Sequence, residues 1–142
     1  MFDEATLCGA CVDLIRRAST DVPQDVESAL RQAAKRETPG SPAAMALAAI
    51  LDNVALARDQ STPVCQDTGV PIFLVQYPVC CSTRRLRTCI ESAVVEATRR
   101  AYLRPNAVDP LSNENSANNL GHGFPTICFE EVDGDQLAID LL

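Results

Sequence analysis

The sequence predicts an α+β fold in which N-terminal helices pack on a small mixed or antiparallel sheet. Four segments space their apolar residues as on one face of a helix, and three shorter segments have the apolar character of strands. The composition agrees, because the 142 residues are 46% hydrophobic but only 4% aromatic. A core made mostly of Ala, Val, Leu and Ile is typical of helices packed closely on each other or on a sheet.

The first expected helix covers about residues 3–17. Its apolar stripe includes Cys8 and Cys11, so we interpret this Cys-x-x-Cys pair as core packing. The competing interpretation is a metal site, but no second pair has the spacing that completes a zinc site.

Two more helices are expected before the first strand. The second begins with Thr20 or Asp21 as its cap and Pro23 in its first turn, and it ends at the sequence TPGS. The third is capped by Ser41 and covers about residues 42–59. Its apolar face is wide, so we expect this helix to be largely buried.

A continuously apolar segment, Val70 to Val75, predicts a strand buried on both faces. A fourth helix is expected over about residues 82–102, with Cys89 on its apolar stripe. The polar segment that follows, residues 103–125, is too long and too varied in sequence to be a simple connector.

Two strands are expected at the end of the chain, over residues 124–131 and 136–142. The sequence VDGD between them contains an Asp-Gly turn, so we expect them to pair as a hairpin. Cys128 alternates into the first of these strands and is interpreted as packing. Because the last strand has no polar tail, we expect residues 1–142 to be one part of a larger domain.

Composition also excludes some functions. The net charge is −7, which argues against binding to nucleic acid or to an anionic membrane surface. No apolar run approaches the roughly 20 residues of a membrane span, and no secretory signal is recognisable. We therefore expect a cytoplasmic protein. An odd number of cysteines without an export signal argues against a disulfide framework; the seven are Cys8, Cys11, Cys65, Cys80, Cys81, Cys89 and Cys128.

The sequence CQDTG, residues 65–69, places four polar or reactive groups in a row before the first strand. Three interpretations stay open. Cys65 is a nucleophile with His122, the one histidine, as its base; or Cys65 is a ligand of a metal or an iron–sulfur cluster; or the segment is a turn in which Asp67 caps the backbone and Gly69 has positive φ.

Three motifs in order, PVCQDTG, LRPNAVDPL and NSANNLGHGFP, resemble the iron–sulfur-dependent hydro-lyases, the family of class I fumarase and the L-tartrate dehydratase α subunit. The resemblance covers nearly the whole chain and identifies it as the N-terminal portion, residues 1–142, of a fumarase α-subunit-type catalytic domain. Two departures lie in the polar segment. Ala117-Asn118 replaces a Gly-Asp pair that is common in the family, and His122 replaces a common arginine.

The resemblance implies that Cys65 binds one iron of a [4Fe–4S] cluster whose open iron acts as a Lewis acid. It implies that Gln66 contacts the substrate, that Asp67 is catalytic, and that Arg104 grips a carboxylate with its planar fork. In the sequence, Arg104 precedes Pro105 in a loop that we expect Asn106 and Asp109 to hold.

The implied reaction is the reversible addition of water to a double bond conjugated with carboxylates. Fumarate and L-malate are the expected pair, and dehydration of L-tartrate is the close alternative. Implied partners are a β subunit or C-terminal domain that supplies the other cluster ligands, and further copies of the enzyme. Two other hypotheses are a non-catalytic assembly module and, less favoured, a cysteine hydrolase.

Overall fold

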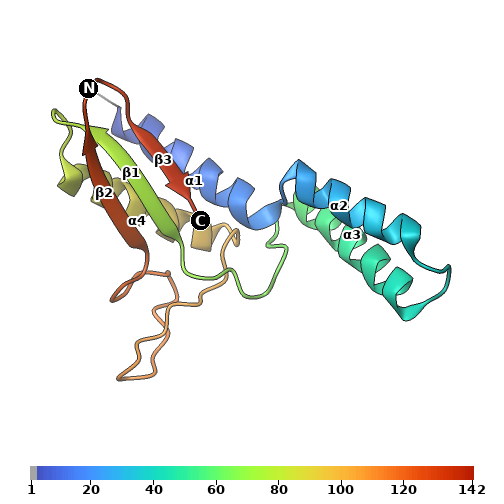
Figure 1. Ribbon diagram of the computed structural model, residues 1–142. Helices are drawn as coiled ribbons and strands as arrows, with labels where there is room; N and C mark the ends of the chain where they lie inside the picture. The colour runs from blue at the N-terminus through green and yellow to red at the C-terminus, as the bar shows by residue number, and fades with distance from the viewer. Residues whose placement is uncertain (1–2) are drawn as a thin grey trace.

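The computed structural model describes residues 3–142. Its sheet lies against a layer made by α1 and α4, and the α2–α3 pair extends away from that layer (Figure 1). In chain order the elements are α1 (Glu4–Thr20), α2 (Gln24–Arg36), α3 (Pro42–Gln60), β1 (Ile72–Pro78), α4 (Thr83–Arg99), β2 (Thr126–Val132) and β3 (Ala138–Leu141). The predicted α+β class is confirmed.

Side-chain caps begin three of the helices. Asp3 accepts a hydrogen bond from the Thr6 amide at 2.8 Å, and the predicted cap Ser41 accepts one from the Ala44 amide at 3.1 Å. Ser82 caps α4 in the same way. Each cap satisfies one of the backbone N–H groups that have no partner in the first helical turn.

The predicted cap of α2 is wrong. The N-cap residue is Pro23, whose side chain has no hydrogen-bond acceptor for the amides of the first turn. Thr20 is instead the last residue of α1, and Asp21 follows it. The Asp21 carboxylate has a different partner, because its Oδ1 accepts a hydrogen bond from Arg58 Nε of α3 at 2.9 Å. It therefore joins the turn after α1 to α3.

β1 is the central strand of a three-stranded mixed sheet with the order β2-β1-β3. β2 pairs with it in parallel and β3 pairs with it antiparallel. The predicted hairpin is therefore wrong, since β1 lies between its two strands. A two-residue type I′ hairpin needs positive φ at both turn residues, but only Gly134 of the Asp133-Gly134 pair has it, at 110°.

One face of β1 is buried, not two. Phe73 and Val75 point into the core, whereas Leu74 between them is 39% exposed. Cys128 lies opposite Leu74 on β2 and is exposed too. The expectation that Cys128 packs in the core is therefore wrong. Within residues 3–142, the helices cover a single face of the sheet.

The core lies between α1, α4 and the buried face of β1. Ile15, Ile90, Val94 and Phe73 are among its buried members. Cys11 and Cys89 are buried as well, which confirms that they pack in the core, while Cys8 is half-buried beside them.

The prediction that α3 is largely buried is wrong. Only Val54 and Ala57 are buried, and Met45 on its outer face is 61% exposed. The reason is that α3 packs mainly on α2, which buries none of its own residues completely. One neighbouring helix cannot cover so wide an apolar face. No helix in the described part of the chain is long and apolar enough to cross a membrane.

The two core thiols predict how stability depends on pH. Burial raises the pKa of Cys11 to about 11 and that of Cys89 to about 12, from an ordinary value of 9.0. Below pH 9 both thiols keep their protons in the folded and the unfolded chain. As the pH rises further, the unfolded chain loses them first, so stability should fall between pH 9 and 12.

Denaturant unfolding from pH 8 to 10.5 measures this effect. The Cys11→Ala/Cys89→Ala variant should be less stable at pH 8 but should lose less stability as the pH rises. Equal losses in the variant and in the unchanged protein would contradict the account of the core thiols.

Candidate functional site

The loop that carries Cys65 is anchored just before the cysteine. The Val64 amide donates to the Ser19 carbonyl at the end of α1, at 2.9 Å. Its carbonyl accepts from Asn53 Nδ2 of α3, also at 2.9 Å. Cys65 itself is exposed and free. An accessible thiol thus follows a backbone position that is held by hydrogen bonds to α1 and α3.

The next residues form the turn that the sequence predicts. Asp67 Oδ1 accepts a hydrogen bond from the Gly69 amide at 2.9 Å, and Gly69 has a φ of +67°. Glycine suits this position because L side chains are disfavoured there. The turn accounts for Asp67 and Gly69 but not for Cys65 or Gln66, whose exposed side chains form no hydrogen bond within residues 3–142.

The segment after α4 lies beside this turn. The Arg104 amide donates to Thr68 Oγ1 at 3.3 Å. Asn106 Nδ2 donates to Asp67 Oδ1 and to Thr68 Oγ1, each at 3.2 Å. The structure therefore brings Arg104, almost 40 positions downstream, next to the CQDTG turn, and the expected contribution of Asn106 to holding the loop is confirmed.

The Arg104 side chain is free to bind an anion. It is exposed, and none of the carboxylates in the described chain lies within 4.0 Å of it. By contrast, Arg99 and Arg100 at the end of α4 each contact Glu96 at 2.7 Å, and these contacts hold the pKa of Glu96 near 2. The two helix arginines thus have a partner within the chain, and Arg104 does not.

A buried amide holds the Arg104 segment in place. Asn119 is 1% exposed, and its Oδ1 accepts from the amides of Asn106 at 2.8 Å and Ala107 at 3.1 Å. Its Nδ2 donates to Thr98 Oγ1 at 3.0 Å and to the Arg104 carbonyl at 2.7 Å. The sequence analysis did not identify Asn119 or Thr68. The signal for Asn119 is weak, because five asparagines crowd the polar segment and only the fold shows which one is buried.

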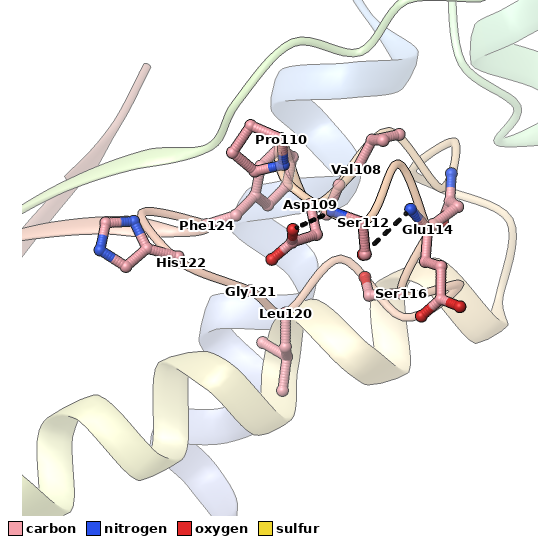
Figure 2. A pocket seen from close by; sticks show the side chains of 12 residues that line it. Val108, Asp109, Pro110, Ser112, Glu114, Ser116, Leu120, Gly121, His122 and Phe124 are labelled. Carbon is pink, nitrogen blue, oxygen red and sulfur yellow. Dashed lines mark hydrogen bonds between the residues drawn. The ribbon is translucent and has the colours of Figure 1, made fainter.

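The polar segment encloses a pocket of about 320 Å³ (Figure 2). Asp109 shapes it, because its Oδ1 accepts hydrogen bonds from the amides of Leu111 and Ser112 at 2.8 and 2.9 Å. These bonds lower the pKa of the Asp109 carboxyl, with a smaller contribution from His122. His122 lines this pocket, and Cys65 does not. The nucleophile–base pair of a cysteine hydrolase therefore has no support in the geometry.

The donor set fits part of an iron–sulfur site. Cys65 offers an accessible thiol of the kind that binds iron. Across residues 3–142, however, no group of three or more His, Cys, Asp or Glu side chains could hold a metal ion. The described residues therefore form no complete metal site, and the assignment of Cys65 as a ligand stays a prediction.

Comparison with known proteins gives consistent matches. Residues 9–142 match the family described as "Fumarate hydratase (Fumerase)". The chain is 41% identical over 129 residues to the "Putative fumarate hydratase class I" of Geobacillus stearothermophilus, a match that covers 91% of this chain and 25% of that protein.

Two further relatives are named as α subunits of L(+)-tartrate dehydratase. Identity is 37% over 122 residues with the "Putative L(+)-tartrate dehydratase subunit alpha" of Methanocaldococcus jannaschii, covering 84% of this chain and 42% of that protein. It is 34% over 128 residues with the L(+)-tartrate dehydratase subunit alpha of Escherichia coli strain K12, covering 87% and 41%. The chain thus spans less than half the length of each of these relatives.

The CQDTG turn predicts a specific cost for a side chain at Gly69. Gly69→Ala should lower the free energy of unfolding by about 1–2 kcal/mol, because alanine is strained at a φ of +67°. An added Cβ meets no atom within 4 Å, so a steric clash contributes nothing. Gly121→Ala is the control, since Gly121 is equally open but does not have positive φ. Equal denaturant midpoints for the two variants would contradict this description of the turn.

Proposed function

The chain belongs to the fumarate hydratase family, and from that premise we propose that residues 1–142 form the N-terminal portion of a fumarase α-subunit-type catalytic domain. The complete enzyme is a hydro-lyase that adds water reversibly to fumarate to give L-malate. The observation that carries this proposal is the placement of the unpaired Arg104 beside the CQDTG turn. Two neighbouring segments then carry a thiol, an amide, a carboxylate and a guanidinium, all on exposed residues.

Each of these groups has a role suited to a dicarboxylate. Arg104 binds one substrate carboxylate, because a guanidinium offers two parallel N–H donors in the geometry that a carboxylate accepts. Gln66 is exposed for hydrogen bonding to the substrate, and Asp67 is the catalytic carboxylate. A local cation is needed in a protein of net charge −7, since the overall charge repels a dianion.

Cys65 is the proposed ligand for one iron of a [4Fe–4S] cluster. Such a cluster with one open iron supplies a Lewis acid for the substrate hydroxyl or carboxylate. The described chain offers no complete set of ligands, so a C-terminal domain or a β subunit supplies the others. The relatives named as α subunits of L(+)-tartrate dehydratase support such a partner. We also propose a homo-oligomer in the cytoplasm, where a reducing environment keeps thiols free.

The second candidate function is the dehydration of L-tartrate, favoured by the names of two relatives. Fumarate comes first because the relative with 41% identity is named as a fumarate hydratase. The test uses the complete protein, reconstituted anaerobically with iron and sulfide. Loss of fumarate absorbance supports the first function, and dehydration of L-tartrate alone supports the second. Activity on neither substrate would favour a non-catalytic assembly module.

Replacement of Cys65 tests the ligand assignment. Cys65→Ser should abolish the intact cluster, because a serine hydroxyl is a poor ligand for iron in place of a thiolate. Bound iron and the broad visible absorption of the reconstituted protein report this loss. Cys128→Ser, at an exposed thiol on the sheet, is the control and should keep both signals. A full cluster in Cys65→Ser would refute the assignment.

Replacement of Arg104 tests the substrate contact. Arg104→Lys keeps the positive charge but loses the bidentate fork, so kcat/KM should fall about 10- to 1,000-fold, or about 1.4–4 kcal/mol of transition-state stabilisation. Iron content should not change. The matched control is Arg84→Lys, at another exposed arginine with no ion pair in the described chain. If the two variants have the same kinetics, or if Arg104→Lys loses the cluster, Arg104 is structural.

A further inference from the structure

Two side-chain amides connect the core of the protein to Asp67. The first, Asn119, donates to Thr98 Oγ1, and Thr98 donates in turn to the Val94 carbonyl at 2.8 Å. Val94 and Ala97 in this stretch of α4 are completely buried. Asn119 is therefore joined to a buried helix of the core, although it belongs to an irregular loop.

The second amide, Asn106, extends this connection to the site. Its backbone amide donates to Asn119 Oδ1 at 2.8 Å, so the origin of its side chain is fixed. Its Nδ2 has two protons and two acceptors, Asp67 Oδ1 and Thr68 Oγ1. Asn106 thus connects its own hydrogen-bonded backbone to the Asp67 carboxylate.

These bonds determine which oxygen of Asp67 faces outward. Oδ1 accepts from both the Gly69 amide and Asn106 Nδ2, while Oδ2 has no hydrogen bond to the described residues. The bond from the Gly69 amide belongs to the turn itself, because Gly69 is only two residues from Asp67 in the chain. Within residues 3–142, the bond from Asn106 is the one direct hydrogen bond between the Asp67 carboxylate and the segment that carries Arg104.

We propose that Asn106, held by Asn119, is a positioning residue that fixes the Asp67 carboxylate with Oδ2 toward the substrate. The inference rests on the proposed function, because it assigns a purpose to Asp67. Asn106 sets the distance and angle between Asp67 and Arg104, which must act on one bound molecule. A displacement of about 1 Å in such an arrangement can reduce the rate about 100-fold.

Asn106→Asp tests this proposal in the complete reconstituted enzyme. The new side chain has the same shape but loses both donated protons and places a second carboxylate beside Asp67. We expect kcat to fall about 10- to 100-fold with little change in KM, because the Arg104 contacts are untouched.

Asn118→Asp is the matched control. It makes the same chemical change in the same loop, but Asn118 is exposed and its Oδ1 only accepts a hydrogen bond, from the Leu120 amide at 3.0 Å. Aspartate keeps that bond. This variant should retain the kcat and the KM of the unchanged enzyme, and both variants should retain iron.

A rise in KM as large as the fall in kcat, or a loss of iron, in Asn106→Asp would overturn the proposal, because a purely structural role predicts that result. Hydrogen exchange separates this inference from the proposed function. In Asn106→Ala, the Gly69 amide, which donates to Asp67 Oδ1, should exchange at least about 10-fold faster, since the carboxylate is free to rotate. Faster exchange supports positioning even if the enzyme acts on neither substrate, and unchanged exchange refutes it.

Discussion

The candidate site depends on the hydrogen-bonding capacity of one buried amide. A side-chain amide removed from water must find protein partners for its donors and acceptor, because an unpaired group costs about 1–3 kcal/mol. Asn119 meets this requirement with four bonds, one to α4 and three to the Arg104 segment. It also has a φ of +59°, which asparagine tolerates better than most residues. An irregular polar segment thereby acquires one defined conformation.

The regular elements determine where the two site loops meet. β1 begins three residues after Gly69 and is held by strands on both sides, so the position of the chain after the CQDTG turn is fixed. α4 packs its buried face on the same sheet and ends just before the Arg104 segment. Both loops therefore leave the layered core at neighbouring points (Figure 1). Hydrogen bonds of about 3 Å then complete an arrangement that packing has already brought close.

Local features were predictable from the sequence, and long-range ones were not. Ser41 as a cap and the Asp67–Gly69 turn follow from short-range chemistry, and the structure contains both. The order of the strands depends on how β2 and β3 pair with the two edges of β1, which no local pattern encodes. The identity of Asn119 as the buried asparagine likewise depends on contacts with residues up to 21 positions away. The proposed roles of Cys65 and Arg104 come from the family motifs, because apolar periodicity carries no information about ligands or substrate contacts.

We propose that the CQDTG turn and the Arg104 segment form a single site for a dicarboxylate. Nuclear magnetic resonance of the complete protein, labelled with ¹⁵N in arginine and glycine, tests it directly during a titration with L-malate. If the two segments form one site, the Arg104 Nε signal and the Gly69 amide signal should shift together along one saturable binding curve. The Arg84 signal should stay in place. Saturable binding that leaves both the Arg104 and the Gly69 signals unmoved would contradict it.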